Sequence, residues 1–335
     1  MFVTVAICTW NRAELLKRCL HRFADLRVPP GVDWELLVIN NNCTDHTDQV
    51  IAECRAAVPL VRVWEPQPGK SFALNTAIGK ARGELILWTD DDVLVDPAWL
   101  ERYVDAARQY PEIDFFGGAI KPVFESPPPR WIETAWRWIS GAYAEIDLGD
   151  EVVPLDRKVH AFGANFAIRT DVQRRYAYDT RLGRVGANEI RCEESDLQWR
   201  MLENGLQGMW VPQANVEHMI PADRLTHDYV RGWQIGIGES IGIMKNEGFR
   251  SRPDWAWRVV LLHTRLNAAR IRYLVSRHVL SSGNWGKYYA RVGFLQGRLR
   301  RLHRIPAEWA ARTRPVAAAP RVSAPASAAK QVATR

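Results

Sequence analysis

Residues 85–92 are Leu85-Ile86-Leu87-Trp88-Thr89-Asp90-Asp91-Asp92, an apolar run of strand length that ends in three consecutive carboxylates. Three apolar segments of the same kind precede it, separated by segments with helical spacing of apolar residues. The strand segments are residues 3–7, 34–39 and 60–64, and the helical ones lie at 13–23, around 50–51 and at about 71–81. Strands that alternate with helices form a parallel sheet covered on both faces. The sequence therefore predicts an α/β, Rossmann-like domain with a mostly parallel central sheet.

Polar residues follow three of these predicted strands at the point where each strand ends. They are Thr9-Trp10-Asn11, Asn40-Asn41-Asn42 and Asp90-Asp91-Asp92. In open α/β sheets, ligands bind outside the carboxyl ends of the strands. Because the carboxyl ends of parallel strands meet at one edge of the sheet, we expect these three clusters to share one site.

The aspartates that follow the fourth strand have the chemistry of a cation site. Side chains alternate along an extended segment, so Asp90 and Asp92 are expected on the same side of the chain. Mg²⁺ and Mn²⁺ bind through one or two carboxylates and take further ligands from substrate phosphates. The alternative is a solvated acidic turn, or a helix N-cap leading into Pro97.

A second acidic cluster, Glu193-Glu194-Ser195-Asp196, lies at the start of a predicted helix. Carboxylates in a first helical turn are stabilised by the helix dipole, so any one of them can be purely structural. Two acidic clusters in one chain nevertheless favour a division of labour. One would hold a cation, and the other would supply a general base for an acceptor hydroxyl.

Two further side chains are candidates for the site. His218 follows a predicted strand at about residues 208–212, where a lone histidine is most often packed or hydrogen-bonded rather than a metal ligand. Pro68-Gly69-Lys70-Ser71 looks like the end of a P-loop, but that motif needs glycine where this chain has Trp64. A lysine at a helix start can still contact a diphosphate.

Composition indicates a globular protein, with 335 residues of which 47% are hydrophobic. The five cysteines are scattered and never form a C-x-x-C pair, which favours neither a disulfide framework nor a zinc site and indicates a reducing cytoplasm. Residues 1–7 are apolar without a basic leader and are interpreted as a buried strand rather than a signal peptide. The apolar runs are shorter than the roughly 18 residues of a membrane span.

The net charge of +7 conceals a division along the chain. Residues 245–335 contain 19 Lys and Arg against 3 Asp and Glu, whereas residues 1–244 contain 26 against 35. A basic segment that bears tryptophans can bind anionic lipid, an anionic acceptor or nucleic acid. The membrane-contact hypothesis rests on apolar residues interleaved with arginines; its alternative is a helix packed on the catalytic domain with the arginines in solvent. These residues are Trp255, Trp257, Arg258, Val259, Val260, Leu261, Leu262, Arg265, Arg270 and Arg272.

Tryptophans also gather after the triple proline at residues 127–129, at Trp131, Trp136 and Trp138. Aromatic faces stack on the apolar faces of sugar rings, so these three could form an acceptor platform over the active face. Ordinary core packing is the alternative for each.

Taken together, several stretches resemble the family 2 inverting glycosyltransferases of the GT-A fold, of bacterial polysaccharide type. The likeness spans roughly residues 3–219, and its motifs occur in the family's order. They are Val5-Ala6-Ile7-Cys8-Thr9-Trp10-Asn11-Arg12, residues 35–45, the G-x-S-x-A-x-N pattern of residues 69–75, residues 83–93, residues 162–169 and Glu193-Glu194-Ser195-Asp196-Leu197.

The resemblance implies a role for each matching position. Asn40 departs from the family pattern, because the family has an aspartate there that helps hold the nucleobase of the donor. Glu194 stands where the family has a catalytic aspartate. The implied donor contacts are Thr9, Asn11, Arg12, Asn40, Asn41, Lys70, Asn75, Asp90 and Asp91. The implied metal ligands for Mn²⁺ or Mg²⁺ are Asp90, Asp92 and His218. Glu194 would be the catalytic base, with Asp196 or Glu193 as alternatives. The acceptor and sugar side would include Gly163, Ala164 and Asn165, with Trp131 beside them.

The resulting prediction is an inverting glycosyltransferase that moves a sugar from a nucleotide-diphosphate-sugar, with UDP expected, to a hydroxyl of a polysaccharide, glycolipid or lipid-linked glycan. The alternatives are a nucleotidyltransferase on a related fold and a non-catalytic glycan-binding module; no nucleic acid partner is expected. Residues 1–225 would form the GT-A catalytic domain, with nucleotide binding in about 1–120 and acceptor binding in about 120–225. Residues 226–306 would form a helical basic region, and residues 307–335 a disordered tail. The expected location is the cytoplasm, with peripheral contact to the inner face of the membrane.

Overall fold

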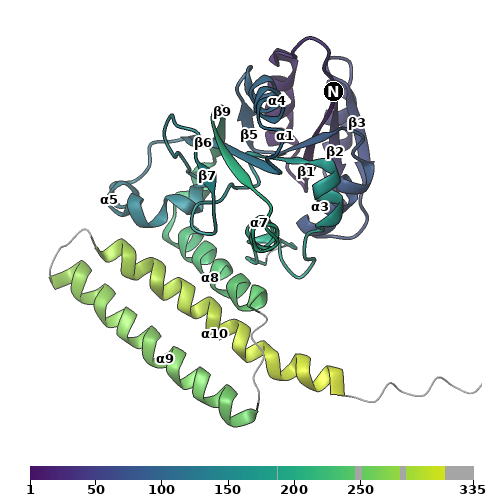
Figure 1. Cartoon of the computed structure of the whole chain (residues 1–335). Helices are drawn as coiled ribbons and strands as arrows, with labels where there is room; N and C mark the ends of the chain where they lie inside the picture. The colour runs from purple at the N-terminus through teal and green to yellow at the C-terminus, as the bar shows by residue number, and fades with distance from the viewer. Residues whose placement is uncertain (187, 246–250, 280–283, 314–335) are drawn as a thin grey trace, which may run out of the picture.

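A mixed sheet forms the centre of the molecule (Figure 1). The computed structural model describes residues 1–186, 188–245, 251–279 and 284–313. Within these residues the sheet has nine strands, in the order β3-β2-β1-β4-β8-β6-β9-β5, with β7 paired to β9. The strands are β1 (Phe2–Thr9), β2 (Asp33–Asn40), β3 (Leu60–Trp64), β4 (Leu85–Asp90), β5 (Val93–Val95), β6 (Phe115–Phe124), β7 (Pro154–Leu155), β8 (Phe166–Arg169) and β9 (Gly208–Ile220).

Strand direction divides the sheet into two parts. The part made by β3, β2, β1 and β4 is parallel, as predicted, and its register pairs Thr9 with Asn40 and Cys8 with Asp90. Beyond β4 the sheet is mixed, because β8 runs antiparallel to both β4 and β6, and β5 and β7 run antiparallel to β9. Only β6 and β9 pair in parallel there. The sheet is therefore less parallel than the sequence predicted, since short apolar strands carry no signal of their direction.

Helices cover both faces of the sheet and form the C-terminal region. The longer helices are α1 (Ala13–Arg22), α2 (Thr47–Cys54), α3 (Lys70–Lys80), α4 (Trp99–Gln109), α5 (Arg130–Ile139), α6 (Thr170–Arg175), α7 (Glu193–Glu203), α8 (His227–Met244), α9 (Arg252–Leu274) and α10 (Trp285–Thr313). Short helical turns are η1 (Phe23–Asp25), η2 (Ser140–Tyr143), η3 (Ala222–Arg224) and η4 (Val275–Val279).

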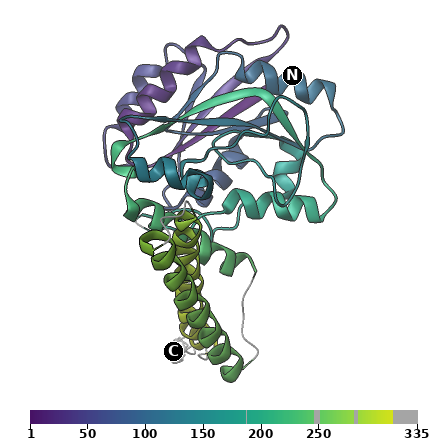
Figure 2. The ribbon, with the colours of Figure 1, turned by 90° about the vertical axis from the view of Figure 1, so that its left-hand side faces the viewer.

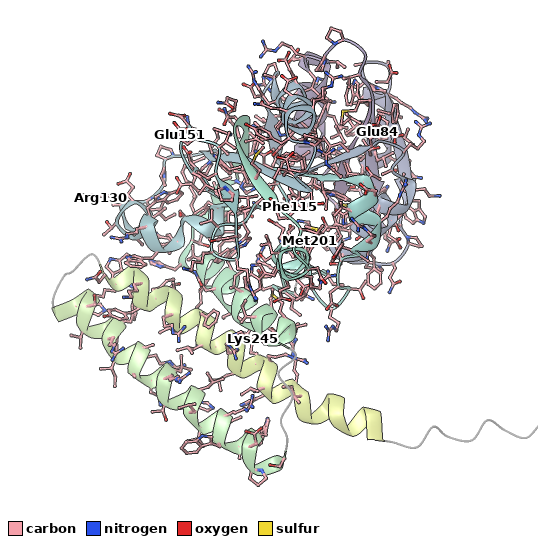
Figure 3. All side chains as sticks on the ribbon, in the orientation of Figure 1. Glu84, Phe115, Arg130, Glu151, Met201 and Lys245 are labelled. Carbon is pink, nitrogen blue, oxygen red and sulfur yellow. The ribbon has the colours of Figure 1, made fainter. Side chains whose placement is uncertain are left out.

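Alternate residues of the central strands supply two separate cores. Val5 of β1 packs with α1, α2 and α4 on one face, whereas Ala6 packs with α3, α6 and α7 on the other. This follows from the two-residue period of a strand, and it explains why these strands are apolar throughout. Figure 3 shows the second core filled by side chains between the sheet and α7, where Phe115 and Met201 are labelled.

The C-terminal helices form a layered extension of the α/β domain. In Figure 1, α10 lies between α8 and α9, and Figure 2 shows the α9–α10 pair projecting away from the domain. Glycines bring α8 and α10 together closely: a Cβ at Gly238 would lie 2.0 Å from the carbonyl oxygen of Phe294, and one at Gly297 would lie 1.9 Å from that of Ile235. The helical C-terminal region is thus confirmed.

The C-terminal region differs from the prediction at its end. Its last helix continues to Thr313, so the prediction of disorder from residue 307 is wrong for residues 307–313, while 314–335 lie outside the described residues. In the described part of the chain, the helices fall short of the combined length and apolarity that crossing a bilayer requires.

Candidate active site

A cavity of about 550 Å³ opens at the carboxyl ends of β1 and β4, where the sequence predicted the site. Its walls come from the strand ends, the start of α3, the loop before β8, the start of α7 and the start of α8. The lining includes Thr9, Asn11, Arg12, Asn41, Lys70, Asp90, Asp91, Asp92, Gly163, Ala164, Glu193, Glu194, His218, Arg224, Tyr229 and Trp233. The structure therefore brings both acidic clusters together around one space.

Arginines neutralise the two carboxylates that follow the end of β4. Arg12 Nη1 lies 2.6 Å from Asp91 Oδ1 and 3.1 Å from Asp92 Oδ2. Thr9 donates its hydroxyl to Asp91 at 2.8 Å, and Arg224 Nη2 lies 3.0 Å from Asp92. Burial raises the pKa of Asp91 and outweighs the charge of Arg12. Burial alone would also raise the pKa of Asp92, but His218 and the arginines hold it well below its usual value.

Asp90 faces a different partner from Asp92. Its carboxylate lies 3.3 Å from Lys70 Nζ, whereas Asp92 shares Arg12 with Asp91. The expected alternation of side chains fails here because β4 ends at Asp90 and the next two residues form a turn. Alternation holds only within an extended segment. Asp90 and Asp92 both line the cavity but pair with different cations, and their joint use as metal ligands stays a prediction.

Lys70 joins the two acidic clusters. It begins α3, and its ammonium nitrogen lies 3.0 Å from Glu194 Oε1, 3.2 Å from Glu193 Oε1 and 3.3 Å from Asp90 Oδ1. Burial would lower the pKa of Lys70, but these three carboxylates raise it well above its ordinary value. Lys70 is thus a permanent cation between the end of β4 and the start of α7.

The two glutamates that begin α7 differ in ionisation. Burial, together with the charge of Glu194, raises the pKa of Glu193 to about 7. Burial would raise the pKa of Glu194 as well, but Lys70 outweighs it and the pKa of Glu194 is lowered. The Glu194 side chain is 16% exposed against 4% for Glu193. Glu194 is consequently the ionised and more accessible carboxylate, and the better candidate for a base.

The loop before β8 is shaped around Glu194. A Cβ on Gly163 would lie 2.3 Å from Glu194 Oε1, so only glycine leaves room for this carboxylate. The carbonyl of Ala164 accepts a hydrogen bond from Thr89 at 3.0 Å, which fixes the loop to β4. Gly163 and Ala164 therefore line the cavity as predicted, and they do so with backbone.

Asn165, by contrast, does not line the cavity. Its side chain is fully buried, and its oxygen accepts bonds from Trp99 Nε1 and Tyr103 Oη, both at 2.7 Å. Its amide group donates to the carbonyls of Ala119 and Ala214. Every polar function of this amide is used inside the fold, so the prediction of a role on the acceptor side is wrong.

Asn40 and Asn75, predicted donor contacts, are also absent from the cavity lining among the described residues. Asn40 is buried and donates to Asp48 at 2.6 Å while accepting from the backbone of Cys43. Asn75 bonds the backbone nitrogen and carbonyl of Tyr178. Both amides therefore brace loops rather than line the cavity.

Asn11 and Asn41 do reach the cavity, but their amides organise the walls. Asn11, with φ of 51°, accepts a bond from the backbone of Thr44 at 2.7 Å. Asn41 accepts from the backbone of Gly69 at 2.9 Å and donates to the carbonyls of Glu65 and Gln67. Asn41 thereby positions the loop that delivers Lys70.

Two other predicted residues lie elsewhere. The Trp131 ring stacks on His227, with centroids 3.9 Å apart, in a cluster formed by α5, α8 and α10. Asp196 pairs with Arg200 one helical turn later, at 2.8 Å. Neither lines the cavity, so the predictions of an acceptor platform at Trp131 and of a base at Asp196 are wrong. At 100° per residue, Asp196 lies nearly opposite Glu194 on the helix.

His218 and Asp92 have donor atoms suited to a divalent cation. His218 Nδ1 lies 2.9 Å from the carbonyl oxygen of Tyr143, which leaves Nε2 facing Asp92 Oδ1 at 3.3 Å. A backbone bond of this kind to the far ring nitrogen is how metal-bound histidines are oriented. Arg224 Nη1 also lies 3.5 Å from Nε2.

The described residues contain no group of three or more His, Cys, Asp or Glu side chains gathered to hold a metal. A Mg²⁺ or Mn²⁺ site that uses one or two carboxylates and substrate phosphates does not need such a group. The residues therefore fit such an ion, with Asp92 and His218 as the adjacent pair.

The first turns of α8 contribute residues that the sequence analysis missed. Tyr229 and Trp233 line the cavity, and the guanidinium of Arg224 lies 5.8 Å from the centre of the Tyr229 ring. The predicted domain boundary at residue 225 thus passes through the site. No motif marks these residues. The four-residue spacing of Tyr229 and Trp233, which puts both rings on one helix face, is the sequence signal that they carry.

Comparison with known proteins agrees with this arrangement. The model of the family described as Glycosyl transferase family 2 matches residues 4–170, about half of the chain. The Glucosyl-dolichyl phosphate glucuronosyltransferase of Haloferax volcanii is 24% identical over 235 residues, which cover 69% of this chain and 73% of that protein.

Two solved structures share the fold. Mannosyltransferase PcManGT from Pyrobaculum calidifontis, in complex with GDP-Man and Mn²⁺, aligns with a TM-score of 0.59 at 17% identity, over 91% of this chain and 87% of that one. S. aureus TarS 1-349, in complex with UDP-GlcNAc, aligns with a TM-score of 0.53 at 15% identity, over 92% of each chain. The predicted GT-A fold is confirmed. Because the matched residues 4–170 supply the strand ends, α3 and the loop around Glu194, the chain belongs to glycosyl transferase family 2 and is a glycosyltransferase.

Proposed function

We propose that this glycosyltransferase moves a sugar from a nucleotide-diphosphate-sugar to an acceptor hydroxyl with inversion, and that Glu194 is the general base. One observation carries the proposal. Lys70 lies within 3.3 Å of Asp90 at the end of β4 and within 3.2 Å of both glutamates at the start of α7. The donor side and the base are therefore neighbours in one cavity.

The donor side of the cavity suits a diphosphate. Arg12, Lys70 and Arg224 all line it, so an anionic leaving group would meet several fixed cations. The similar folds of TarS and PcManGT were solved with UDP-GlcNAc and GDP-Man respectively. UDP is the nucleotide we propose. The asparagine at position 40 does not argue against UDP, because its amide bonds to Asp48 and Cys43 and does not line the cavity.

The proposed reaction is a direct displacement. The acceptor oxygen forms a bond to the anomeric carbon as the bond from that carbon to the diphosphate oxygen breaks, and the acceptor proton passes to Glu194. Lys70 keeps Glu194 ionised in the free protein. When a diphosphate enters, Lys70 has a second anion to pair with, and weaker pairing with Glu194 would raise the basicity of that carboxylate.

Asp92 and His218, with Asp90 nearby, would hold the divalent cation, Mn²⁺ or Mg²⁺. When bound, such an ion supplies Lewis-acid neutralisation of the charge on the departing diphosphate. Arg12 and Arg224 hold the Asp92 carboxylate in place through its other oxygen, which leaves the oxygen that faces His218 for the ion.

For the acceptor we propose a hydroxyl of a glycan or of a lipid-linked glycan. The name of the Haloferax volcanii relative states action on glucosyl-dolichyl phosphate. Tyr229 and Trp233 line the same cavity as Glu194, and aromatic rings stack well on sugar faces, so they take the role that the sequence had suggested for Trp131. A location at the cytoplasmic face of a membrane is part of this proposal.

The test is a screen of the purified protein against UDP-, GDP- and dTDP-sugars with Mn²⁺ or Mg²⁺, followed by thermal shift and donor hydrolysis. We expect one nucleotide class to raise the Tm only in the presence of metal. Asp92→Asn should abolish that shift, and Glu194→Gln should keep the shift but lose transfer.

Asp196→Asn is the matched control, because it removes a carboxylate of the same helix outside the cavity, and it should behave as wild type. A metal-dependent shift that survives in Asp92→Asn would refute the cation site. The absence of any donor response from folded protein would point instead to a non-catalytic glycan-binding module.

A further inference from the structure

Helix α9 is apolar on two opposite faces. On the inner face, Leu262, Leu266 and Ala269 are buried against leucines of α10. On the outer side, large apolar side chains are exposed along the helix and into η4. They are Trp257 (66% exposed), Val260 (55%), Leu261 (36%), Ile271 (62%), Leu274 (53%) and Val275 (40%), here called the outer α9 face.

The spacing of these residues places the outer α9 face on one side of the helix, as two apolar groups with Thr264, Asn267 and Ala268 between them. Residues 257, 260 and 261 recur at 271, 274 and 275, fourteen positions on, which is close to four helical turns. At 100° per residue this face lies opposite the buried positions 262, 266 and 269. A surface helix normally buries its apolar residues on one side only, so a second apolar stripe on solvent indicates a contact surface.

Arginines border the stripe on both sides. Arg258, Arg265 and Arg272, at seven-residue intervals, lie between the outer and inner faces on one side, and Arg270 lies on the other. Arg277 instead packs against Trp285 of α10. Residues 252–313 contain 13 Lys and Arg against 2 Asp and Glu. Long arginine side chains can extend their charged ends to phosphate groups while their stems cover apolar surface.

We propose that the outer α9 face docks on an anionic lipid bilayer. A central apolar stripe with a tryptophan, bordered on both sides by arginines, is complementary to a lipid surface that has phosphates above an apolar interior. A protein partner would need acidic groups on both sides of an apolar groove, whereas a bilayer offers that pattern everywhere. The inference rests on the membrane location in the proposed function and adds the surface that makes the contact, and flotation tests it separately from donor binding.

The structure corrects which residues make this contact. Trp255, which the sequence had grouped with Trp257, donates its indole N–H to the carbonyl of Leu302 on α10 at 2.9 Å. Leu262 is buried and Val259 packs against the same cluster. Of the apolar residues first considered, Trp257, Val260 and Leu261 face outward.

Two helix layers, α8 and α10, separate the outer α9 face from the cavity. Helix α8 lines the cavity with Tyr229, Trp233 and Ile237, α10 packs on α8, and α9 packs on α10 (Figure 1). A bilayer bound by α9 would therefore lie on the side of the site where α8 forms the wall.

The test is flotation of the full chain with vesicles of phosphatidylcholine alone and of phosphatidylcholine with phosphatidylglycerol. We expect binding to the anionic vesicles only. The double variant Trp257→Ser/Ile271→Ser should lower the partition coefficient about tenfold or more. Arg265→Gln/Arg272→Gln should lower it roughly fivefold for each arginine.

Matched controls keep the result interpretable. Val28→Ser/Val152→Ser replaces apolar side chains of the α/β domain that are 39% and 48% exposed, and it should bind as wild type. All these replaced side chains are solvent-exposed, so the variants should retain the wild-type Tm.

Equal binding of the Trp257→Ser/Ile271→Ser variant, or failure of wild type to float with anionic vesicles, would overturn the proposal. So would light scattering that shows a wild-type dimer which this variant dissolves, because the outer α9 face would then belong to a second copy of the chain.

Discussion

Lys70 is the residue on which the ionisation of the site depends. Its contact with both glutamates of α7 separates their pKa values, since Glu194 receives the shorter ion pair and Glu193 is the more buried. A general base must be ionised at the working pH and close to the acceptor. Glu194 satisfies the first condition over a wider pH range than Glu193.

The pH profile of transfer distinguishes the two glutamates. Because Lys70 lowers the pKa of Glu194, kcat/KM should stay level from neutral pH into the acidic range, with its acid limb well below pH 7. If Glu193 were the base, the limb would lie near its pKa of about 7. Glu194→Gln should reduce kcat by about 10² to 10⁴.

The measurement is kcat/KM for the acceptor across pH, with donor at saturation. Lys70→Met is an informative companion, because loss of the ammonium should raise the pKa of Glu194 and move the acid limb to higher pH. An acid limb near pH 7 in wild type would assign the base to Glu193.

At the scale of elements, the glycines between α8 and α10 decide how the C-terminal region attaches. A Cβ at Gly297 would lie 1.9 Å from the carbonyl oxygen of Ile235 and 2.8 Å from the backbone nitrogen of Glu239. Backbone atoms cannot move aside as the end of a flexible side chain can. The two helices must therefore separate if any larger residue is placed there.

Gly297→Ala should destabilise the protein by about 1–3 kcal/mol, in spite of the better helix propensity of alanine. Gly79→Ala in α3 is the control, because its new Cβ would meet no atom within 4 Å, and it should stabilise by about 0.5–1 kcal/mol. Thermal or urea unfolding measures both. Equal stability of the two variants would contradict the close approach of α8 and α10.

At the scale of the whole molecule, charge is divided between an acidic catalytic part and a basic helical part. Residues 1–244 carry 26 Lys and Arg against 35 Asp and Glu, and residues 245–335 carry 19 against 3. The acidic groups around the cavity are largely buried and paired, whereas many arginines of α9 are exposed. Salt should therefore affect the two parts differently.

Raising the salt concentration from 0.15 M to 1 M shortens the Debye length from about 8 Å to about 3 Å. We expect binding to anionic vesicles to be largely lost, because its arginines are exposed, while the Tm shift produced by the donor persists. Flotation and thermal shift at the two salt concentrations measure this. Vesicle binding that is insensitive to salt would mean that the contact is apolar alone.

Much of the fold and part of the site could be predicted from the order of residues. Continuous apolar strands followed by polar residues determine a parallel sheet with a site at its edge, and Thr9, Asn41 and the three aspartates indeed meet there. The prediction of these residues succeeds because the local pattern of each strand is enough to place the side chains at its carboxyl end. The start of α7, with its two glutamates, was recognisable for the same local reason.

Only the tertiary structure decided which of the polar residues are available to a ligand. Asn75 and Asn165 have the right chemistry, but groups far away in the sequence engage their amides, and Asn40 is engaged by Asp48. Arg224 and Tyr229 enter the site from η3 and α8, and α9 exposes its second apolar face because α10 covers the first. A sequence determines which groups exist and which share an element, whereas their partners depend on contacts between elements that no local spacing encodes.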